Sequence, residues 1–304
     1  MLSDLFSMNT MNAPDRCGVL NINKPANVTS RRVVDAVQRI VRPAKAGHGG
    51  TLDPLATGVV VVCVGAATRL IPYVQQGRKE YRAQFRFGCR SNTDDITGEV
   101  DPVDDAPQPA AAEVQQALKK YVGEIEQIPP QFSAVHVDGR RAYKLARAGM
   151  DVEIAPRPVH VYRIDLLEYD YPELSVEIEC GSGTYIRSLG RDLGNDLGCG
   201  AVMTQLVRTR VGDYRLEAAV DLEALSTQTL DAALLPALSA VAHLPRYVCS
   251  PTQVDLIRHG RPIDPGQPGP HDPAEPVAIV APDGDLAAIA FWKSGSLAPK
   301  NVFA

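Results

Sequence analysis

The chain has 304 residues, of which 45% are hydrophobic and 22% charged, and its formal net charge is −5. These values are ordinary for a globular protein, and no apolar run reaches the roughly 20 residues of a membrane span. Residues 1–16 lack the features of a signal peptide and are expected to form a flexible leader. The six cysteines show no CxxC pair and no metal-ligand spacing, which favours reduced thiols in a cytoplasmic protein without structural zinc.

The charge is distributed unevenly along the chain. Residues 16–93 hold 13 Lys or Arg against 3 Asp or Glu, whereas residues 94–126 and 216–304 are acidic. A local basic field attracts a phosphate backbone within a Debye length of roughly 8–10 Å, even when the whole protein is acidic. The alternative is a solvated surface that happens to be basic, but the size of the excess favours a nucleic-acid partner.

The first elements are a strand, a helix and a second strand. Residues 18–23 predict a short strand, and Thr29 or Ser30 can cap a helix with apolar residues at helical spacing that ends at Pro43. A glycine-rich loop follows. It leads into Val59–Val64, an uncharged, β-branched run that is typical of a buried strand.

Asp53 is the one carboxylate in this glycine-rich loop, and Pro54 follows it. A proline holds the preceding residue away from the α region, so the backbone of Asp53 is extended or part of a turn. A lone acid at the mouth of a buried strand is costly unless it has a partner or a role. Two interpretations remain open, a turn cap, as in many Asp-Pro pairs, or a reactive carboxylate.

The strand predicted at Lys79–Gly88 alternates between an aromatic face and a polar face. Its polar face consists of Arg82, Gln84 and Arg86. This pattern predicts a half-buried strand with a basic outer face. Tyr81, on the aromatic face, is either a core tyrosine with a satisfied hydroxyl or a member of a functional pocket.

Residues 127–149 mix cations, among them Arg140, Arg141 and Lys144, with aromatic side chains. Cations beside exposed aromatics suit phosphate contact and base stacking. A solvated amphipathic helix is the alternative interpretation. A helix at residues 113–121 is expected before this segment.

Further strands are predicted at residues 159–169, 174–180 and 201–211. Thr184 can cap a helix between the last two, and Arg187 falls in the first turn of that helix. The helix dipole disfavours a cation there, so Arg187 should have an anionic partner unless it is simply exposed.

The composition shifts near residue 216. Prolines and apolar runs beyond it predict short helical segments, a loop and a hairpin, at residues 222–240, 262–276 and 277–292. We therefore expect one large domain at residues 17–245 and a small β-rich domain at residues 246–304.

Several kinds of chemistry lack their signatures. The chain contains no GxxxxGK[ST], GxGxxG, HxxxH or GxSxG motif, which argues against nucleotide hydrolysis, hydride transfer, zinc hydrolysis and serine catalysis. A carboxylate, a tyrosine, an arginine and a basic surface remain. A carboxylate can attack a sugar carbon or an electron-poor ring, and a neighbouring arginine keeps it ionised and oriented.

Five collinear stretches resemble the TruB family of tRNA pseudouridine synthases. They are Gly18–Pro25, Gly47–Gly58, Lys79–Ala83, Gln127–Ala134 and Gly181–Gly194. The resemblance implies an α+β pseudouridine synthase fold, a long mixed, mostly antiparallel sheet with flanking helices, plus a PUA-like C-terminal domain and an RNA-gripping insertion at about residues 127–155. It also implies conversion of uridine 55 in the tRNA T-loop to pseudouridine, without a metal or cofactor.

The resemblance implies roles for individual residues. Asp53 matches the nucleophilic aspartate, Tyr81 the tyrosine that stacks on the target base, and Arg187 the arginine paired with the aspartate. Substrate contacts are implied for His48, Tyr185, Leu206, Lys24, Arg140, Arg141 and Lys144. The target base would be flipped out of the loop. Asp53 would then attack C1′, add to C6 or abstract a sugar proton, and these three routes remain open.

The chain departs from the family pattern at three positions. Gly49 stands where threonine is common, Asn23 where aspartate is common, and His136 where lysine is common. None of these departures touches the proposed chemistry.

Two other functions use some of the same features. A non-catalytic RNA-binding or tRNA-folding protein would use the basic face, but it would not need Asp53, Tyr81 and Arg187 together. A small-molecule glycosyl enzyme would not need the basic segment at residues 16–93. We expect tRNA as the partner of a monomer, without a membrane or an obligate protein partner.

Overall fold

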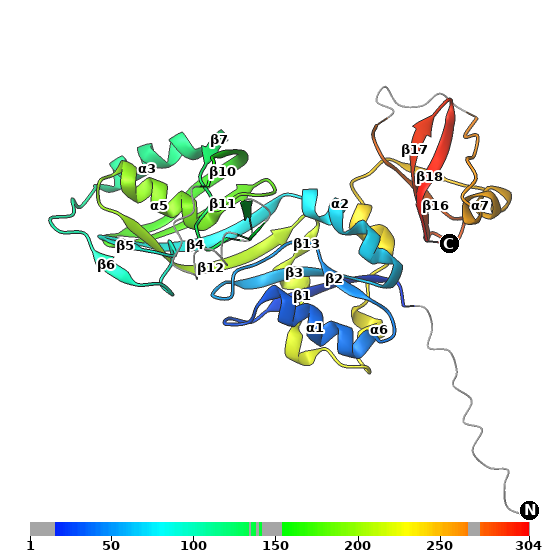
Figure 1. Cartoon of the computed structure of the whole chain (residues 1–304), viewed down its shortest axis with the longest axis horizontal. Coiled ribbons are helices and arrows are strands. Elements are labelled where there is room, and N and C mark those ends of the chain that lie inside the picture. The colour runs from blue at the N-terminus through cyan, green and yellow to red at the C-terminus, as the bar shows by residue number, and fades with distance from the viewer. Residues whose placement is uncertain (1–15, 134, 138–139, 142–153, 267–273, 304) are drawn as a thin grey trace, which may run out of the picture.

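The computed structural model describes residues 16–133, 135–137, 140–141, 154–266 and 274–303. The predicted leader before residue 16, and Lys144 within the predicted insertion, therefore lie outside the described residues. Figure 1 shows an elongated molecule with a long twisted sheet, helices packed on it, and a separate small sheet near the C-terminus. No helix in the described part of the chain is long and apolar enough to span a membrane.

The large sheet is mixed and mostly antiparallel, which confirms the predicted fold class. Its strands are, in spatial order, β14 (Val220–Asp221), β1 (Gly18–Lys24), β3 (Thr57–Val64), β12 (Ala201–Val211), β4 (Lys79–Phe87), β11 (Glu173–Cys180), β10 (Arg157–Asp170) and β7 (Gly123–Gln127). Short strands β2 (Ala46–His48) and β13 (Tyr214–Arg215) pair with β3 and β12. Only β1 with β14 and β12 with β3 run parallel among these described pairs.

Helices lie along the large sheet (Figure 1), and two separate two-stranded ribbons accompany it. The α-helices there are α1 (Ser30–Val41), α2 (Ile71–Gln76), α3 (Ala111–Leu118), α5 (Ile186–Asp196) and α6 (Leu230–Ala233). Short 3-10 turns are η1 (Gly65–Leu70), η2 (Lys119–Tyr121), η3 (Leu216–Ala218), η4 (Leu222–Ala224) and η5 (Ala237–Val241). The ribbons are β5 (Cys89–Ser91) with β6 (Val100–Pro102), and β8 (His136–Val137) with β9 (Arg140–Arg141).

The small C-terminal sheet forms its own layer with one helix. It consists of β15 (Arg246–Val248), β16 (Val277–Val280), β17 (Leu286–Lys293) and β18 (Ser296–Val302), covered by α7 (Pro251–Arg258). A separate cluster of buried apolar side chains, including Ile257, Ile279 and Leu297, holds these elements together. The predicted hairpin at residues 277–292 is confirmed as β16 and β17.

β3 is buried on both faces, which explains its unbroken apolar sequence. Val60, Val62 and Val64 belong to the core beneath α1 and α5, whereas Val59, Val61 and Cys63 belong to the core on the opposite face. Because successive side chains of a strand point to opposite faces, a strand between two cores has no place for a polar side chain. The Asp53 loop is therefore attached to one of the most deeply packed strands.

The arginines on the outer face of β4 are exposed as predicted, but they are paired. Arg82 lies 3.2 Å from Glu177 and Arg86 lies 2.7 Å from Glu173, each directly across the strand pair with β11. Opposite charges facing each other across two strands stabilise the pairing by roughly 0.2–1 kcal/mol. The basic excess counted along residues 16–93 is thus partly neutralised by acids that lie far away in the sequence.

One local prediction needs correction. Thr184 does not cap α5, because Tyr185 occupies the cap position without a side-chain cap and the Thr184 hydroxyl donates to the carbonyl of Gly181 at 3.3 Å. Thr29, in contrast, does cap α1, accepting from the amide of Arg32 at 3.2 Å. The short helical segments predicted at residues 222–240 are confirmed as η4, α6 and η5.

The departures at Gly49 and Asn23 have local explanations. A Cβ atom on Gly49 would lie 2.4 Å from Cγ1 of Val74, so threonine does not fit beside this valine. Asn23 donates to the carboxylate of Asp221 at 2.8 Å on the neighbouring strand β14. An aspartate at position 23 would place two like charges there.

Gly58, at the start of β3, supports a backbone contact that brings β12 to the Asp53 loop. Its φ is +102°, and a Cβ atom would lie 2.3 Å from the backbone oxygen of Arg208. We predict that Gly58→Ala lowers the free energy of unfolding by at least about 3 kcal/mol, because neither backbone can move away from a packed sheet. Urea unfolding measures this difference.

Gly284→Ala is the matched control, since its φ is +93° and nothing lies within 4 Å of the added Cβ. It should cost only the conformational strain, about 1–2 kcal/mol. Equal losses in the two variants would show that the contact with Arg208 is not what requires glycine at position 58.

Candidate active site

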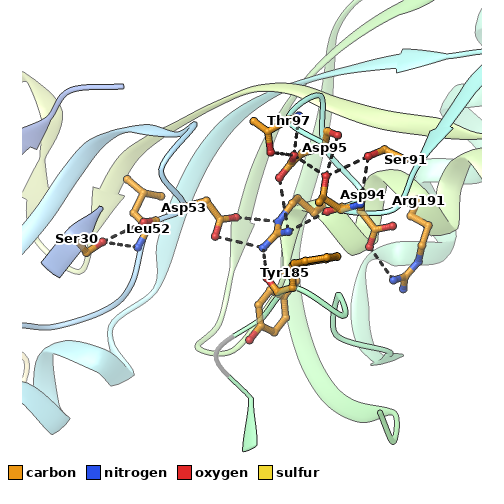
Figure 2. A network of polar contacts seen from close by, with 12 residues as sticks. Ser30, Leu52, Asp53, Ser91, Asp94, Asp95, Thr97, Tyr185 and Arg191 are labelled. Carbon is orange, nitrogen blue, oxygen red and sulfur yellow. Dashed lines mark hydrogen bonds and ion pairs between the residues drawn. The ribbon is translucent and has the colours of Figure 1, made fainter. Parts of the chain in front are cut away.

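The Asp53 loop is fixed by polar contacts on both sides of the carboxylate. On one side, the hydroxyl of Ser30 accepts from the amide of Leu52 at 2.8 Å and donates to its carbonyl at 3.0 Å (Figure 2). On the other side, the carbonyl of Pro54 accepts from Lys24 Nζ at 3.2 Å and from the amide of Asn27 at 2.7 Å. The backbone around Asp53 is therefore held in place before any substrate arrives.

Arg208 on β12 also holds this loop, through hydrogen bonds to backbone carbonyls. Its guanidinium donates to the carbonyls of Val59, Thr51 and Gly50 at 2.7, 3.2 and 3.2 Å, and the residue is only 2% exposed. A buried guanidinium that is bonded to three carbonyls is difficult to move, because each broken bond would leave a desolvated polar group. Arg208 thus joins β12 to the start of the Asp53 loop.

Arg187 in the first turn of α5 faces Asp53 with two nitrogens. Nε lies 2.9 Å from Oδ2 of Asp53, and Nη2 donates to Oδ1 at 3.3 Å. The alignment at Nε is too poor for a hydrogen bond, so that contact is an ion pair. The arginine side chain is 6% exposed and the aspartate side chain 31% exposed. The predicted anionic partner of Arg187 is confirmed, and the carboxylate keeps an open side.

Asp95 lies on the opposite side of the same guanidinium (Figure 2). Its Oδ2 is 3.6 Å from Nη1 of Arg187, and its Oδ1 accepts from the amide of Thr97 at 2.9 Å and from the hydroxyl of Thr93 at 2.9 Å. Two carboxylates around one buried arginine set its position and its orientation. Asp95 therefore positions Arg187.

The start of the predicted insertion is attached to α5. The carbonyl of Ile128 accepts from Ser188 at 2.9 Å and from Arg191 at 2.8 Å. The side-chain amide of Gln127 donates to the carbonyl of Tyr185 at 3.0 Å and accepts from its amide at 2.7 Å. These bonds hold the wall of the site against the helix that carries Arg187.

A cavity of about 280 Å³ opens beside the carboxylate of Asp53. Tyr81, Tyr185, Leu206 and Arg187 all line it, so the structure brings these predicted site residues together. Burial raises the pKa of the Tyr81 hydroxyl, and the positive charge of Arg208 opposes this shift. The Tyr81 hydroxyl is thus neutral near pH 7.

His48 lies in a second, larger hollow. This hollow, of about 780 Å³, shares Asp53 and Arg187 with the first cavity, so the ion pair forms the boundary between the two. Burial lowers the pKa of His48, as does the nearby charge of Arg208, and Nδ1 accepts from the amide of Gly50 at 3.3 Å. The imidazole is therefore neutral near pH 7.

Lys24, which was also predicted to contact the substrate, is not among the described residues that line either hollow. Lys24 is fully buried and donates to backbone carbonyls of Pro25, Val28 and Pro54, so it supports the loop from within. Burial lowers its pKa to about 8, against the favourable charge of Asp53. Arg140 and Arg141 form the short strand β9 beside β8. Lys144 lies outside the described residues.

Three further residues at the site were not singled out from the sequence, namely Asp95, Arg208 and Lys79. Asp95 stands in an acidic stretch that resembles a surface connection, and Arg208 is one of two arginines at the end of a strand. Lys79 begins the stretch Lys79–Ala83 that resembles the family, and it lies two residues before Tyr81, so the two side chains share one face of the strand. This spacing of two residues is the one feature of the sequence that could have identified Lys79 as a site residue. Within the described ranges, no group of three or more His, Cys, Asp or Glu side chains could hold a metal ion.

Comparisons with known proteins agree with this geometry. Residues 38–186 match the family model of the TruB family pseudouridylate synthase N-terminal domain, and residues 187–242 match the model of the tRNA pseudouridylate synthase B C-terminal domain. A tRNA pseudouridine synthase B from Ruegeria pomeroyi is 40% identical over 95% of this chain and 96% of its own length. The protein of that name from Synechocystis sp. is 45% identical over 75% of this chain and 79% of its own length.

Solved structures show the same architecture. A chain of a Cbf5-Nop10-Gar1 complex is 28% identical with a TM-score of 0.74, over 94% of this chain and 85% of that chain. A chain of an H/ACA RNP bound to a substrate RNA containing 2'-deoxyuridine is 26% identical with a TM-score of 0.73, over the same shares. The similarity therefore includes both the large sheet and the small C-terminal one.

Ser30 offers a direct test of how the Asp53 loop is held. We predict that Ser30→Ala lowers the free energy of unfolding by about 2–3 kcal/mol, because it leaves both backbone groups of Leu52 buried without a partner. Thr29→Ala, which removes one exposed cap bond from the same helix, should cost only about 1 kcal/mol. Hydrogen exchange at the Leu52 amide should accelerate in the first variant alone, and unchanged exchange would contradict this view of the loop.

Proposed function

This chain belongs to the TruB family of tRNA pseudouridine synthases, and on that premise we propose that it converts uridine 55 in the tRNA T-loop to pseudouridine, with Asp53 as the nucleophile. The chain is an isomerase that acts on a uridine of tRNA, as its relatives at about 40% identity over nearly the whole chain indicate. The position of the modified uridine and the sequence of bond changes are our proposal.

One observation carries the proposal. Among the described residues, Asp53 is the only carboxylate that lines the cavity beside Tyr81, and a buried arginine holds it with two nitrogens at 2.9 and 3.3 Å. An arginine in this position pairs with the charge of the carboxylate and fixes its direction. A turn cap would need neither this partner nor the aromatic walls of the cavity.

The shape of the cavity supports base flipping. Its volume of about 280 Å³ is close to the lower end of small-molecule sites, about 300 Å³, which suits one nucleoside rather than a helix. A uridine in a folded loop must leave its stack to enter, at a cost of a few kcal/mol. Stacking on the ring of Tyr81 would offset that cost by roughly 1–3 kcal/mol.

The reaction is an isomerisation within one nucleotide. The N1–C1′ bond breaks, the detached base rotates, and a new bond joins C5 to C1′. Asp53 would open the sequence by attacking C1′, by adding to C6 or by abstracting a sugar proton. Leu206 and Tyr185 would enclose the base and exclude water while it is detached.

Surfaces outside the cavity would bind the RNA. We assign residues 17–245 to the catalytic domain, residues about 127–155 to an RNA-gripping insertion, and residues 246–304 to a PUA-like domain. The outer face of α1 offers exposed cations such as Arg32 and Arg39 for phosphate contacts. We expect a cytoplasmic monomer that needs no metal or cofactor.

Asp53→Asn tests the nucleophile. We predict a loss of turnover on the order of 10⁴-fold or more, because the amide keeps the shape of the site but cannot form the required bond. Pseudouridine at position 55 of a tRNA transcript is measured by chemical mapping, and a transcript with cytidine at that position is the control. Binding of tRNA should stay within about threefold, since few phosphate contacts change. Turnover near the wild-type rate would remove Asp53 from the mechanism.

Asp95→Asn tests the positioning of Arg187. We predict a fall in the single-turnover rate of about 10–10²-fold with unchanged tRNA affinity, because Arg187 loses one of its two carboxylate partners. Asp101→Asn removes an exposed carboxylate on β6 and serves as the matched control. A wild-type rate in the Asp95 variant would show that Asp53 alone suffices to orient the guanidinium.

A further inference from the structure

Arg187 is engaged mainly with the protein. Its Nη1 and Nη2 atoms donate three hydrogen bonds, to Oδ1 of Asp53 at 3.3 Å and to the carbonyls of Thr93 and Phe132 at 2.9 and 3.2 Å. Nε and Nη1 also form ion pairs with Oδ2 of Asp53 at 2.9 Å and Oδ2 of Asp95 at 3.6 Å. Arg187 therefore serves chiefly to orient Asp53, which leaves the stabilisation of charge on the base to another group.

Lys79 lines the same cavity and has no role in the mechanism so far. It lies on β4 two residues before Tyr81, so both side chains share one face of the strand, and it is 6% exposed. Its register partners are Val211 on β12 and Cys180 on β11. The ammonium group is thus inside the cavity wall, next to the ring that would stack on the base.

Lys79 is only partly satisfied by the protein. Its Nζ donates to the carbonyl of Gln75, and no carboxylate lies within 4 Å of it among the described residues. An ammonium carries three donors, so two are available. A buried cation without an anion is costly, and such a group commonly serves a ligand.

Resting on the proposed function, we propose that Lys79 donates a hydrogen bond to the pyrimidine ring and stabilises the negative charge that the ring acquires during isomerisation. All three routes open to Asp53 place this charge on the ring. Cleavage of the N1–C1′ bond, whether by attack on C1′ or after loss of a sugar proton, leaves the electron pair on N1, spread over O2 and O4. Addition to C6 places it on C5 and O4.

All three routes balance without any further reagent. The electron pair that leaves with N1 returns through C5 when the C5–C1′ bond forms. On the two covalent routes the bond to Asp53 breaks and releases its carboxylate, and on the third route Asp53 returns the proton to the sugar. The proton on C5 is then transferred to N1. Lys79 keeps its own proton throughout, because it acts as a fixed positive donor toward a group whose charge is transient.

The competing explanation is purely structural. The carbonyl of Gln75 lies in the last turn of α2, and a lysine there satisfies a free helix carbonyl. That role would affect folding and the position of the helix, but it would not respond to the electronic character of the substrate base. The experiment must therefore change the base as well as the protein.

We expect Lys79→Met to lower the single-turnover rate of pseudouridine formation by about 10²-fold, with tRNA affinity unchanged. Lys79→Arg, which keeps a cation, should recover most of this loss. Lys119→Met removes an exposed lysine of η2 far from the cavity and should react at the wild-type rate. A rate within twofold of wild type in Lys79→Met would overturn the proposal.

Replacing the target uridine with 5-fluorouridine distinguishes a catalytic role of Lys79 from a purely structural role as a donor to the carbonyl of Gln75. Fluorine withdraws electrons and stabilises the ring anion, so less help from the lysine is needed. The rate ratio between wild type and Lys79→Met, measured as loss of the parent nucleoside, should shrink from about 10²-fold to less than about 10-fold. An unchanged ratio on the two substrates would indicate a structural role alone and would overturn the proposal.

The wild-type protein provides a test that needs no variant. Burial and the charge of Arg208 on β12 lower the pKa of Lys79 to about 8, and the Cys180 thiol on β11 opposes this shift. The Tyr81 hydroxyl, also on β4, is neutral in this range because burial raises its pKa. The single-turnover rate should thus fall as pH rises through about 8, and in Lys79→Arg the fall should move to higher pH.

A coincident fall in both proteins would contradict the assignment to Lys79. The measurements also distinguish a failure of the proposed function from a failure of the proposed role of Lys79. If the wild-type protein forms no pseudouridine at position 55, the proposed function fails; if it does and the Lys79 variants behave like wild type, only the role of Lys79 fails.

Discussion

The ion pair between Asp53 and Arg187 determines how the rest of the molecule must be built. The two residues are 134 positions apart in the chain, and the guanidinium is almost fully buried. A buried guanidinium is costly unless acceptors and opposite charges surround it, so the carbonyls of Thr93 and Phe132 and the carboxylate of Asp95 are drawn to the same point. Satisfying one cation thus brings the loop after β5, the segment before β8 and the start of α5 together around the carboxylate.

The charges of this protein divide into two groups that the net charge does not distinguish. On the outer face of β4, arginines such as Arg82 face glutamates of β11 and contribute to pairing rather than to an RNA-binding field. Around the cavity, Arg208 and Lys79 have no carboxylate within 4 Å among the described residues, and both are buried. The electrostatic attraction that an anionic base would experience is therefore concentrated where the chemistry takes place, in a region that water screens poorly.

Local patterns in the sequence predicted most of the fold, and the motifs predicted the centre of the site. The apolar run of β3 and the alternation of β4 follow directly from which faces are buried. The dipole argument predicted a partner for Arg187, but nothing local indicated that Asp95 would share it, since an acid in a polar connection has the same composition whether it is exposed or buried. The ion pair of Arg82 could not be predicted from the sequence either, because Glu177 lies 95 residues away and faces Arg82 only through the register of two strands.

The order of strands in the large sheet has a consequence for biosynthesis. β3 and β4 are joined by a short connection, yet β12 lies between them and carries Arg208 to the Asp53 loop. A chain emerging from the ribosome therefore carries Asp53 without β12 and Arg208 beside it, and the sheet can close only after residue 211 has been made. A nascent or truncated chain that ends before β12 consequently lacks both the strand and the guanidinium that hold the Asp53 loop in the closed sheet.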